Sequence, residues 1–229
     1  SQNFFITLYL ILRLFIFRKF SFTEKKFYKR YLQLNKENLD FKSRGIYSQD
    51  WFSYNIKYIV RPIYKYNFDK KNLKILEIGS YEGLSTVFFL NLLKDSKITC
   101  VDPFSDFEEN KDKDFNKVYE NFIKNTDLYK DRIKLFRNTS DKFFANISND
   151  VYDLIYIDGS HHADNVYKDA ENSYSKLKKG GIIIFDDFLW NYHKDPNHNP
   201  LGGIKKFIAN NFFKIRIISL SYQIIVMKI

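Results

Sequence analysis

Short apolar runs alternate with longer segments of helical spacing over most of the chain. Each run is too short for a helix and is bounded by turn-forming residues, as a buried strand is. In the segments between the runs, apolar residues recur every three or four positions, which predicts helices that each bury one face. The alternation predicts an α/β protein built on a parallel sheet. The expected strands are residues 73–78, 97–101, 132–136, 152–158, 182–185, 213–218 and 223–228.

Charge divides the sequence near Asn72. Residues 1–72 hold 15 Lys and Arg against 5 Asp and Glu, whereas residues 73–229 hold 22 of each kind. The whole net charge of +10 therefore belongs to the N-terminal part. This asymmetry predicts a basic, helical N-terminal extension over 1–72 and an electrically balanced domain over 73–229.

The extension begins with an apolar segment and continues with a basic one. Residues 4–17 are almost wholly apolar, but these 14 residues include Arg13 and fall short of the ~20 needed to cross a bilayer. Residues 22–34 are basic, with the spacing of an amphipathic helix. The apolar face expected on that helix consists of Phe27, Tyr31 and Leu34.

Two interpretations of residues 4–34 stay open. The segment is either a helix pair that packs on the core or on a second subunit of a homo-oligomer, or a peripheral contact with an anionic membrane or substrate. Nucleic acid is the partner supported least, because charge alone does not identify one. The basic residues follow the apolar run, unlike those of a signal peptide, and the single cysteine, Cys100, lies in an apolar run. We therefore expect a cytoplasmic protein, either free or peripheral to a membrane.

The first strand of the balanced domain runs directly into a glycine-containing turn. Glu77 lies near the end of that strand, and Gly79 and Gly83 flank the turn, where a missing Cβ lets a ligand lie against bare backbone. The dinucleotide pattern Gly-x-Gly-x-x-Gly is absent, because Tyr81 and Leu84 stand where it needs glycine. Any strand, glycine turn and helix of an α/β protein can have this pattern, so the turn alone does not identify its ligand.

The spacing acidic-x-Gly-x-x-x-Gly resembles the first motif of class I S-adenosylmethionine-dependent methyltransferases. The resemblance covers residues 73–229. It implies a Rossmann-like, mostly parallel sheet of seven strands with a C-terminal antiparallel hairpin, and S-adenosylmethionine as cofactor. It also implies that the cofactor contacts residues of the turn and of the helix that follows. These residues are Glu77, Gly79, Ser80, Gly83 and Ser85.

Two further positions are candidates for binding the nucleoside. Asp102 ends the second expected strand, 19 positions after Gly83, where its carboxylate can accept hydrogen bonds from both ribose hydroxyls. The alternative is a capping or turn aspartate before Pro103. Ser140 follows the third strand, where the resemblance implies contacts to the adenine ring; it also suits an ordinary helix N-cap.

Three carboxylates are expected at the same edge of the sheet. Asp158 ends the fourth strand, and Asp186 and Asp187 end the fifth. Ligands of parallel α/β sheets bind beyond the carboxyl ends of the strands. Unpaired carboxylates that converge there repel one another unless they are protonated or neutralised. The pattern therefore predicts a divalent cation with oxygen ligands, Mg²⁺ in the first place.

This acidic set is similar to the metal triad of Mg²⁺-dependent O-methyltransferases, which include catechol O-methyltransferase and bacterial enzymes that act on antibiotic sugars. In the sugar enzymes a histidine three positions after the first metal-binding aspartate acts as base, and His161 matches that position. Asp158 has the further alternative of holding the ammonium group of the donor without any metal. Asp186 and Asp187 have the alternative of capping the next segment.

These observations predict a metal-assisted O-methyltransferase that acts on a small hydroxylated compound, a sugar or glycoconjugate by resemblance. Methyl transfer needs alignment of donor and nucleophile and a lowered pKa of the acceptor hydroxyl. His161 and Asp158 are the expected catalytic residues. One alternative is a metal-independent methyltransferase for a nucleic-acid or membrane-associated substrate. The other is a non-catalytic nucleoside-binding module.

Overall fold

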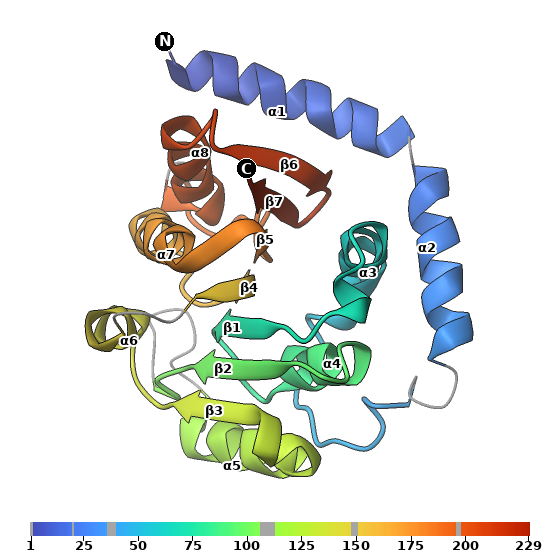
Figure 1. Ribbon diagram of the computed structural model, residues 1–229. Helices are drawn as coiled ribbons and strands as arrows, with labels where there is room; N and C mark the ends of the chain where they lie inside the picture. The colour runs from blue at the N-terminus through green and yellow to red at the C-terminus, as the bar shows by residue number, and fades with distance from the viewer. Residues whose placement is uncertain (1, 20, 36–39, 106–112, 148–150, 196–197) are drawn as a thin grey trace.

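The computed structural model describes the chain except residues 1, 20, 36–39, 106–112, 148–150 and 196–197, and the side chains of residues 2–4, 16–19 and 21–24. One sheet of seven strands organises it, in the order β3-β2-β1-β4-β5-β7-β6 (Figure 1). All neighbours are parallel except β7, which runs antiparallel to β5 and β6. The expected mostly parallel sheet with a C-terminal hairpin is confirmed. The strands are β1 Lys74–Ile78, β2 Lys97–Val101, β3 Ile133–Phe136, β4 Tyr152–Ile157, β5 Leu177–Phe185, β6 Ile215–Leu220 and β7 Ile224–Lys228.

Helices cover both faces of the sheet because successive strand residues point to opposite sides. In β5, Ile182 and Ile184 belong to one hydrophobic cluster with residues of α3, α4 and α5, whereas Ile183 and Phe185 belong to a second cluster with residues of α6, α7 and α8. The helices are α1 Gln2–Lys19, α2 Ser21–Leu34, α3 Ile56–Lys65, α4 Leu84–Leu92, α5 Phe115–Thr126, α6 Ser140–Asn146, α7 Ala163–Lys176 and α8 Pro200–Asn210.

The first two helices wrap the outside of the hairpin end and of α3 (Figure 1). α1 packs on α8 and β6 and buries Ile6 and Leu10. α2 packs on α3 and buries Tyr31, but Leu34 is 61% exposed and does not continue the expected apolar face. Tyr28 and Leu32 pack against the core in place of Leu34. Within the described residues, no helix is both long and apolar enough to span a membrane.

The fifth strand is longer than expected. We expected it over residues 182–185, but α7 ends at Lys176 and β5 begins at Leu177. Leu177 pairs with Tyr152, and the register then shifts before Leu154 pairs with Ile182. The extra residues form an irregularity in which Gly180 adopts a φ of 76°, a left-handed conformation that glycine adopts without a Cβ penalty.

Candidate active site

A cavity of about 250 Å³ lies beyond the carboxyl ends of β1, β2 and β4. This is where the strand order reverses, because β2 lies on one side of β1 and β4 on the other (Figure 1). Such a switch point is the usual ligand crevice of an open α/β sheet. Several of the predicted site residues line it: Gly79, Asp102, Ser140, Asp158 and His161.

Gly79 lets the β1 turn approach the end of β4. Its φ is 83°, and a Cβ at this position would lie 1.9 Å from the carbonyl oxygen of Asp158. The Gly79 amide donates to the carbonyl of Val101 at 2.9 Å, and the Asp158 amide donates to the carbonyl of Ile78 at 2.8 Å. Only a glycine fits this conformation and this contact, so the cavity wall is bare backbone here.

Glu77 lies beneath the turn and has no exposed surface. Its carboxylate accepts hydrogen bonds from the hydroxyls of Ser80 at 2.8 Å and Ser85 at 2.7 Å, and also from Thr86. The Cys100 thiol donates to it at 3.3 Å. Burial raises the pKa of Glu77, and these donors oppose the rise. The side chains of Glu77, Ser80 and Ser85 thus face one another, whereas we expected them to face the cofactor.

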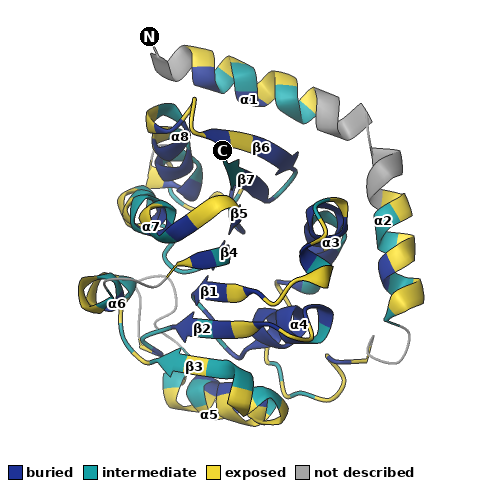
Figure 2. Cartoon of the chain, viewed as in Figure 1, coloured by how far each residue is buried: buried dark blue, intermediate teal, exposed yellow. Residues whose placement is uncertain are grey.

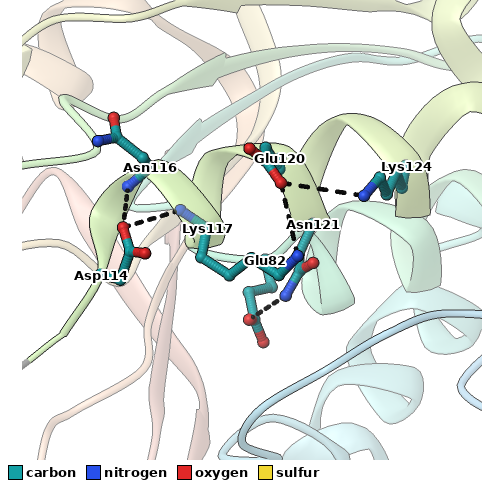
Figure 3. A network of polar contacts seen from close by, with 7 residues as sticks. All are labelled: Glu82, Asp114, Asn116, Lys117, Glu120, Asn121 and Lys124. Atoms are coloured by element: carbon teal, nitrogen blue, oxygen red, sulfur yellow. Dashed lines mark hydrogen bonds and ion pairs between the residues drawn. The ribbon is translucent and has the colours of Figure 1, made fainter.

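Gly83 and Glu82 fasten the turn to other elements. A Cβ on Gly83 would lie 2.9 Å from the Thr126 side chain, so the glycine allows α5 to pack closely. Glu82 is buried and accepts from Asn121 of α5 at 2.8 Å (Figure 3). It also accepts from the Ser48 hydroxyl at 3.0 Å. No local sequence pattern indicates this role, because both partners are more than 30 positions away.

Asp102 has the turn role, which is one of the two alternatives that the sequence left open. Its carboxylate accepts from the amides of Ser80 at 2.8 Å, Tyr81 at 2.9 Å and Phe104 at 2.7 Å, the last within its own turn. It also lines the cavity. Burial raises its pKa, and the three amides oppose the rise. A carboxylate offers about four lone-pair positions, so at least one remains for a ligand hydroxyl.

The acidic end of the site brings Asp158, His161 and Asp187 together. One ligand atom from each lies within 4.8 Å of the others, and His161 Nε2 is 3.1 Å from Asp187 Oδ2. Asp186 is directed elsewhere: its Oδ1 accepts from Asn55 Nδ2 at 3.3 Å and from the Gln223 amide. We expected Asp158, Asp186 and Asp187 to form the cluster. The close cluster instead contains two carboxylates, Asp158 and Asp187, and the His161 imidazole.

Negative charge accumulates at this edge. Burial, followed by the charges of Asp186 and Asp187, raises the pKa of Asp158 well above its usual range. Burial and the charge of Asp187 raise the pKa of Asp186 to about 7. The same three carboxylates, after burial, contribute to raising the pKa of Tyr222 to about 12. A donor set of two carboxylates and one imidazole in such a field fits a divalent cation.

Aromatic rings form a wall beside His161, in the segment between β5 and α8. The His161 ring stacks on Trp190 with a centroid distance of 4.3 Å, and Trp190 stacks on Tyr192 at 5.4 Å. Buried Asn199 holds the segment by accepting from the amides of Tyr192 at 3.0 Å and His193 at 2.9 Å. Sequence reasoning missed this wall, since nothing in the residue pattern places Trp190 against the candidate base.

A second cluster in the cavity lining consists of Trp51, Tyr81 and Lys113. Lys113 Nζ lies 4.1 Å from the ring centroid of Trp51 and 4.7 Å from that of Tyr81. This buried ammonium has no hydrogen-bond partner among the residues that the structure describes. Burial lowers its pKa. The other lysine of the lining, Lys168, is 2.6 Å from Asp141.

Comparison with known sequences places part of the chain in a family. Residues 76–188 match the model of a family described as "Methyltransferase domain". A "Probable caffeoyl-CoA O-methyltransferase 3" from Dictyostelium discoideum is 32% identical over 127 residues, which cover 51% of this chain and 44% of that protein. The chain spans about half the length of the curated relatives it matches.

Solved structures share the fold at low sequence identity. An O-methyltransferase from Bacillus cereus in complex with SAH has a TM-score of 0.56 at 17% identity, with 90% of each chain covered. The MycE methyltransferase from the mycinamycin biosynthetic pathway, in complex with Mg, SAH and mycinamycin VI, has a TM-score of 0.57 at 16% identity; the match covers 79% of this chain and 50% of that one. Residues 76–188 thus match a methyltransferase domain, and the sheet has the Rossmann-like fold of these methyltransferase structures.

Proposed function

We propose that the chain transfers a methyl group from S-adenosylmethionine to a hydroxyl of a small molecule. The observation that carries the proposal is that Gly79, Asp102, Asp158 and His161 line one cavity, and that Asp187 lies 3.1 Å from His161 at its edge. The first two suit a nucleoside, and the third suits a hydroxyl that must lose its proton. The related O-methyltransferases and the SAH complexes of the same fold support this choice.

The donor is held along the cavity by groups of matching charge. Asp102 accepts from the ribose hydroxyls, Ser140 contacts the adenine, and the bare backbone at Gly79 leaves room for the chain that bears the sulfonium. In the alternative without a metal, Asp158 takes the donor ammonium. The donor carboxylate then needs a cation, and Lys113 is available because Lys168 is already paired with Asp141. The turn itself is held in shape by Glu77, Ser80, Gly83 and Ser85, which position its backbone for the donor.

Asp158 and Asp187 would hold a divalent cation, with Mg²⁺ as the first candidate. Such an ion would supply positive charge that favours the ionised form of an acceptor hydroxyl. His161 takes the proton, and its contact with Asp187 and stacking on Trp190 fix the ring for that transfer. Asp186 joins the ion only if an oxygen of its carboxylate turns away from Asn55 and Gln223.

The acceptor is a small hydroxylated compound, with a sugar or glycoconjugate as the preferred class. The stacked rings of Trp190 and Tyr192 beside His161 offer a flat apolar surface, which suits one face of a sugar ring or an aromatic ring. The complex of MycE with mycinamycin VI supports the sugar-bearing class. A vicinal diol would present two oxygens to the cation together.

The test combines ligand binding with methyl transfer. Calorimetry should detect S-adenosylmethionine and its demethylated product, and manganese bound by the wild-type protein should give an altered electron paramagnetic resonance signal. Asp187→Asn should weaken manganese binding while donor binding is retained. Asp127→Asn is the control, because Asp127 is an exposed carboxylate paired with Lys130. Transfer of radiolabelled methyl to pooled sugars and phenols should require His161. Absence of donor binding by the folded protein would refute the proposal.

A further inference from the structure

α1 is apolar on both sides, and only one side is covered. Ile6 and Leu10 are buried against the domain, whereas Phe5, Leu8, Leu12 and Phe15 lie on the outward side at spacings of three and four. With Ile11, these five side chains are between 44% and 70% exposed. Figure 2 shows the exposed residues along the outer side of the helix. We call this surface the outer face of α1.

A second apolar element adjoins the outer face. Tyr9 of α1 meets Phe212 at a centroid distance of 5.3 Å, and Phe212 meets Phe213 at the same distance. Phe213 follows α8 and is 89% exposed. Contiguous apolar surface of this kind is uncommon on a protein that meets only water, and it marks a docking site.

The charge around this surface is of one sign. Residues 5–34 contain seven Lys or Arg and one acidic residue, Glu24. Among them Lys25, Lys26, Lys29 and Arg30 are exposed on α2, which follows α1 in the chain and turns away from it (Figure 1). Lys214, next to Phe213, is exposed as well. The occupant must therefore be apolar where it meets α1 and anionic at its surface.

We propose that the outer face of α1 docks on an anionic lipid bilayer, with the helix lying along the interface. Phenylalanine and leucine side chains enter the boundary between headgroups and acyl chains, and the cations of α2 meet anionic headgroups. The opposite side of α1 stays packed on α8 and β6, so docking needs no unfolding. The proposal goes beyond the methyl-transfer activity and does not depend on it.

A second copy of the chain fits this surface less well. A two-fold contact places the same patch on both partners. It would bring the two basic N-terminal segments close together, without acidic side chains in α1 to compensate. Like charges at short range oppose such pairing, whereas anionic headgroups favour docking.

Vesicle sedimentation tests the proposal. The wild-type chain should bind vesicles of phosphatidylcholine mixed with phosphatidylglycerol, more weakly at high salt, and should bind phosphatidylcholine alone least. The triple variant Phe5→Ser, Leu12→Ser, Phe15→Ser should lose about tenfold in partitioning. Leu128→Ser should bind as wild type, because this side chain is 77% exposed and lies between α5 and β3, whereas α1 packs on β6 at the opposite edge of the sheet.

Two measurements make the outcome decisive. The melting temperature of the triple variant must match that of the wild type, because only outward side chains change. A second variant combines Lys25→Gln, Lys26→Gln and Lys29→Gln. It should reduce only the salt-sensitive part of vesicle binding. Vesicle binding that is equal in the wild type and the triple variant overturns the proposal. The proposal is also overturned if light scattering shows that the wild type is a dimer that does not bind vesicles, and that the triple variant is a monomer.

Discussion

Replacing Lys113 with Met should weaken the binding of the whole donor and spare that of its nucleoside half. The ammonium is the charged group at stake, because Met keeps a stem of similar length against Trp51 and Tyr81. Lys113 has no hydrogen-bond partner among the described residues, so the substitution breaks no such bond of the free protein there.

The magnitude follows from two opposing effects. A hydrogen bond between charged groups contributes about 1.5–3 kcal/mol. Since about 1.4 kcal/mol corresponds to tenfold in affinity, the variant should bind about 10 to 150 times more weakly. In the free protein the loss of two ring contacts, about 0.5–1 kcal/mol each, is offset by removal of a partly desolvated cation. The melting temperature should therefore change little.

Calorimetry with two thioethers isolates the effect. S-adenosylhomocysteine carries the amino-acid part, whereas 5′-methylthioadenosine has the same adenine and ribose without it. Lys113→Met should weaken only the first ligand. Lys117→Met is the matched control, because Lys117 is exposed on α5 and its Nζ lies 3.5 Å from Glu120 in a surface pair (Figure 3).

The comparison separates two kinds of failure. An unchanged affinity for S-adenosylhomocysteine in Lys113→Met, or an equal loss for both ligands, would refute the role of Lys113 and leave the donor site standing. If the wild type bound neither ligand, the donor site itself would be wrong.

Three further predictions concern stability, each measured by denaturant unfolding. Glu77→Ala should cost at least about 3 kcal/mol, because three hydroxyls and a thiol lose their acceptor; Glu77→Gln should cost less, and an equal cost would contradict this. Burial raises the pKa of Asp169 to about 6, so the free energy of unfolding of the wild type falls as pH rises through that value. Asp169→Asn should therefore stabilise the fold by up to about 3 kcal/mol at pH 7.5 and little at pH 4. Gly79→Ala should cost more than about 4 kcal/mol and Gly180→Ala about 1–2, because both have positive φ but only Gly79 faces backbone; similar costs would disprove the clash.

The sheet could be predicted because its signals are local. Each strand is a short apolar run, and the order of runs and helical segments leaves few topologies for a parallel sheet. The predicted strand boundaries were wrong where pairing with a neighbouring strand determines them. The start of β5 at Leu177 depends on Tyr152 of a neighbouring strand, and glycines that normally end a helix are absorbed as an irregularity in the strand.

The site could be predicted only in part, for a related reason. Gly79, Asp102 and Asp158 were predicted to lie together because strand ends meet at one edge of the sheet, and all three line the cavity. Trp190 and Lys113 were not, because their contacts join segments that no local pattern relates: Trp190 meets His161 29 positions before it, and Lys113 meets Trp51 across 62 positions. Loop side chains at a site are positioned by tertiary packing, so their periodicity carries no information.

The two adjacent aspartates after β5 show how the strand geometry assigns different tasks. Ile184 and Asp186 are two positions apart, and side chains two apart share a face. Asp186 therefore points to the side of Tyr156 and accepts from Asn55 and Gln223, whereas Asp187 turns toward His161. The buried carboxylate adds its charge to the field at Asp158, so it favours a cation at the cavity edge without having to touch it. On the proposed function, Asp187 would bind the cation and Asp186 would contribute to the electrostatic potential around it.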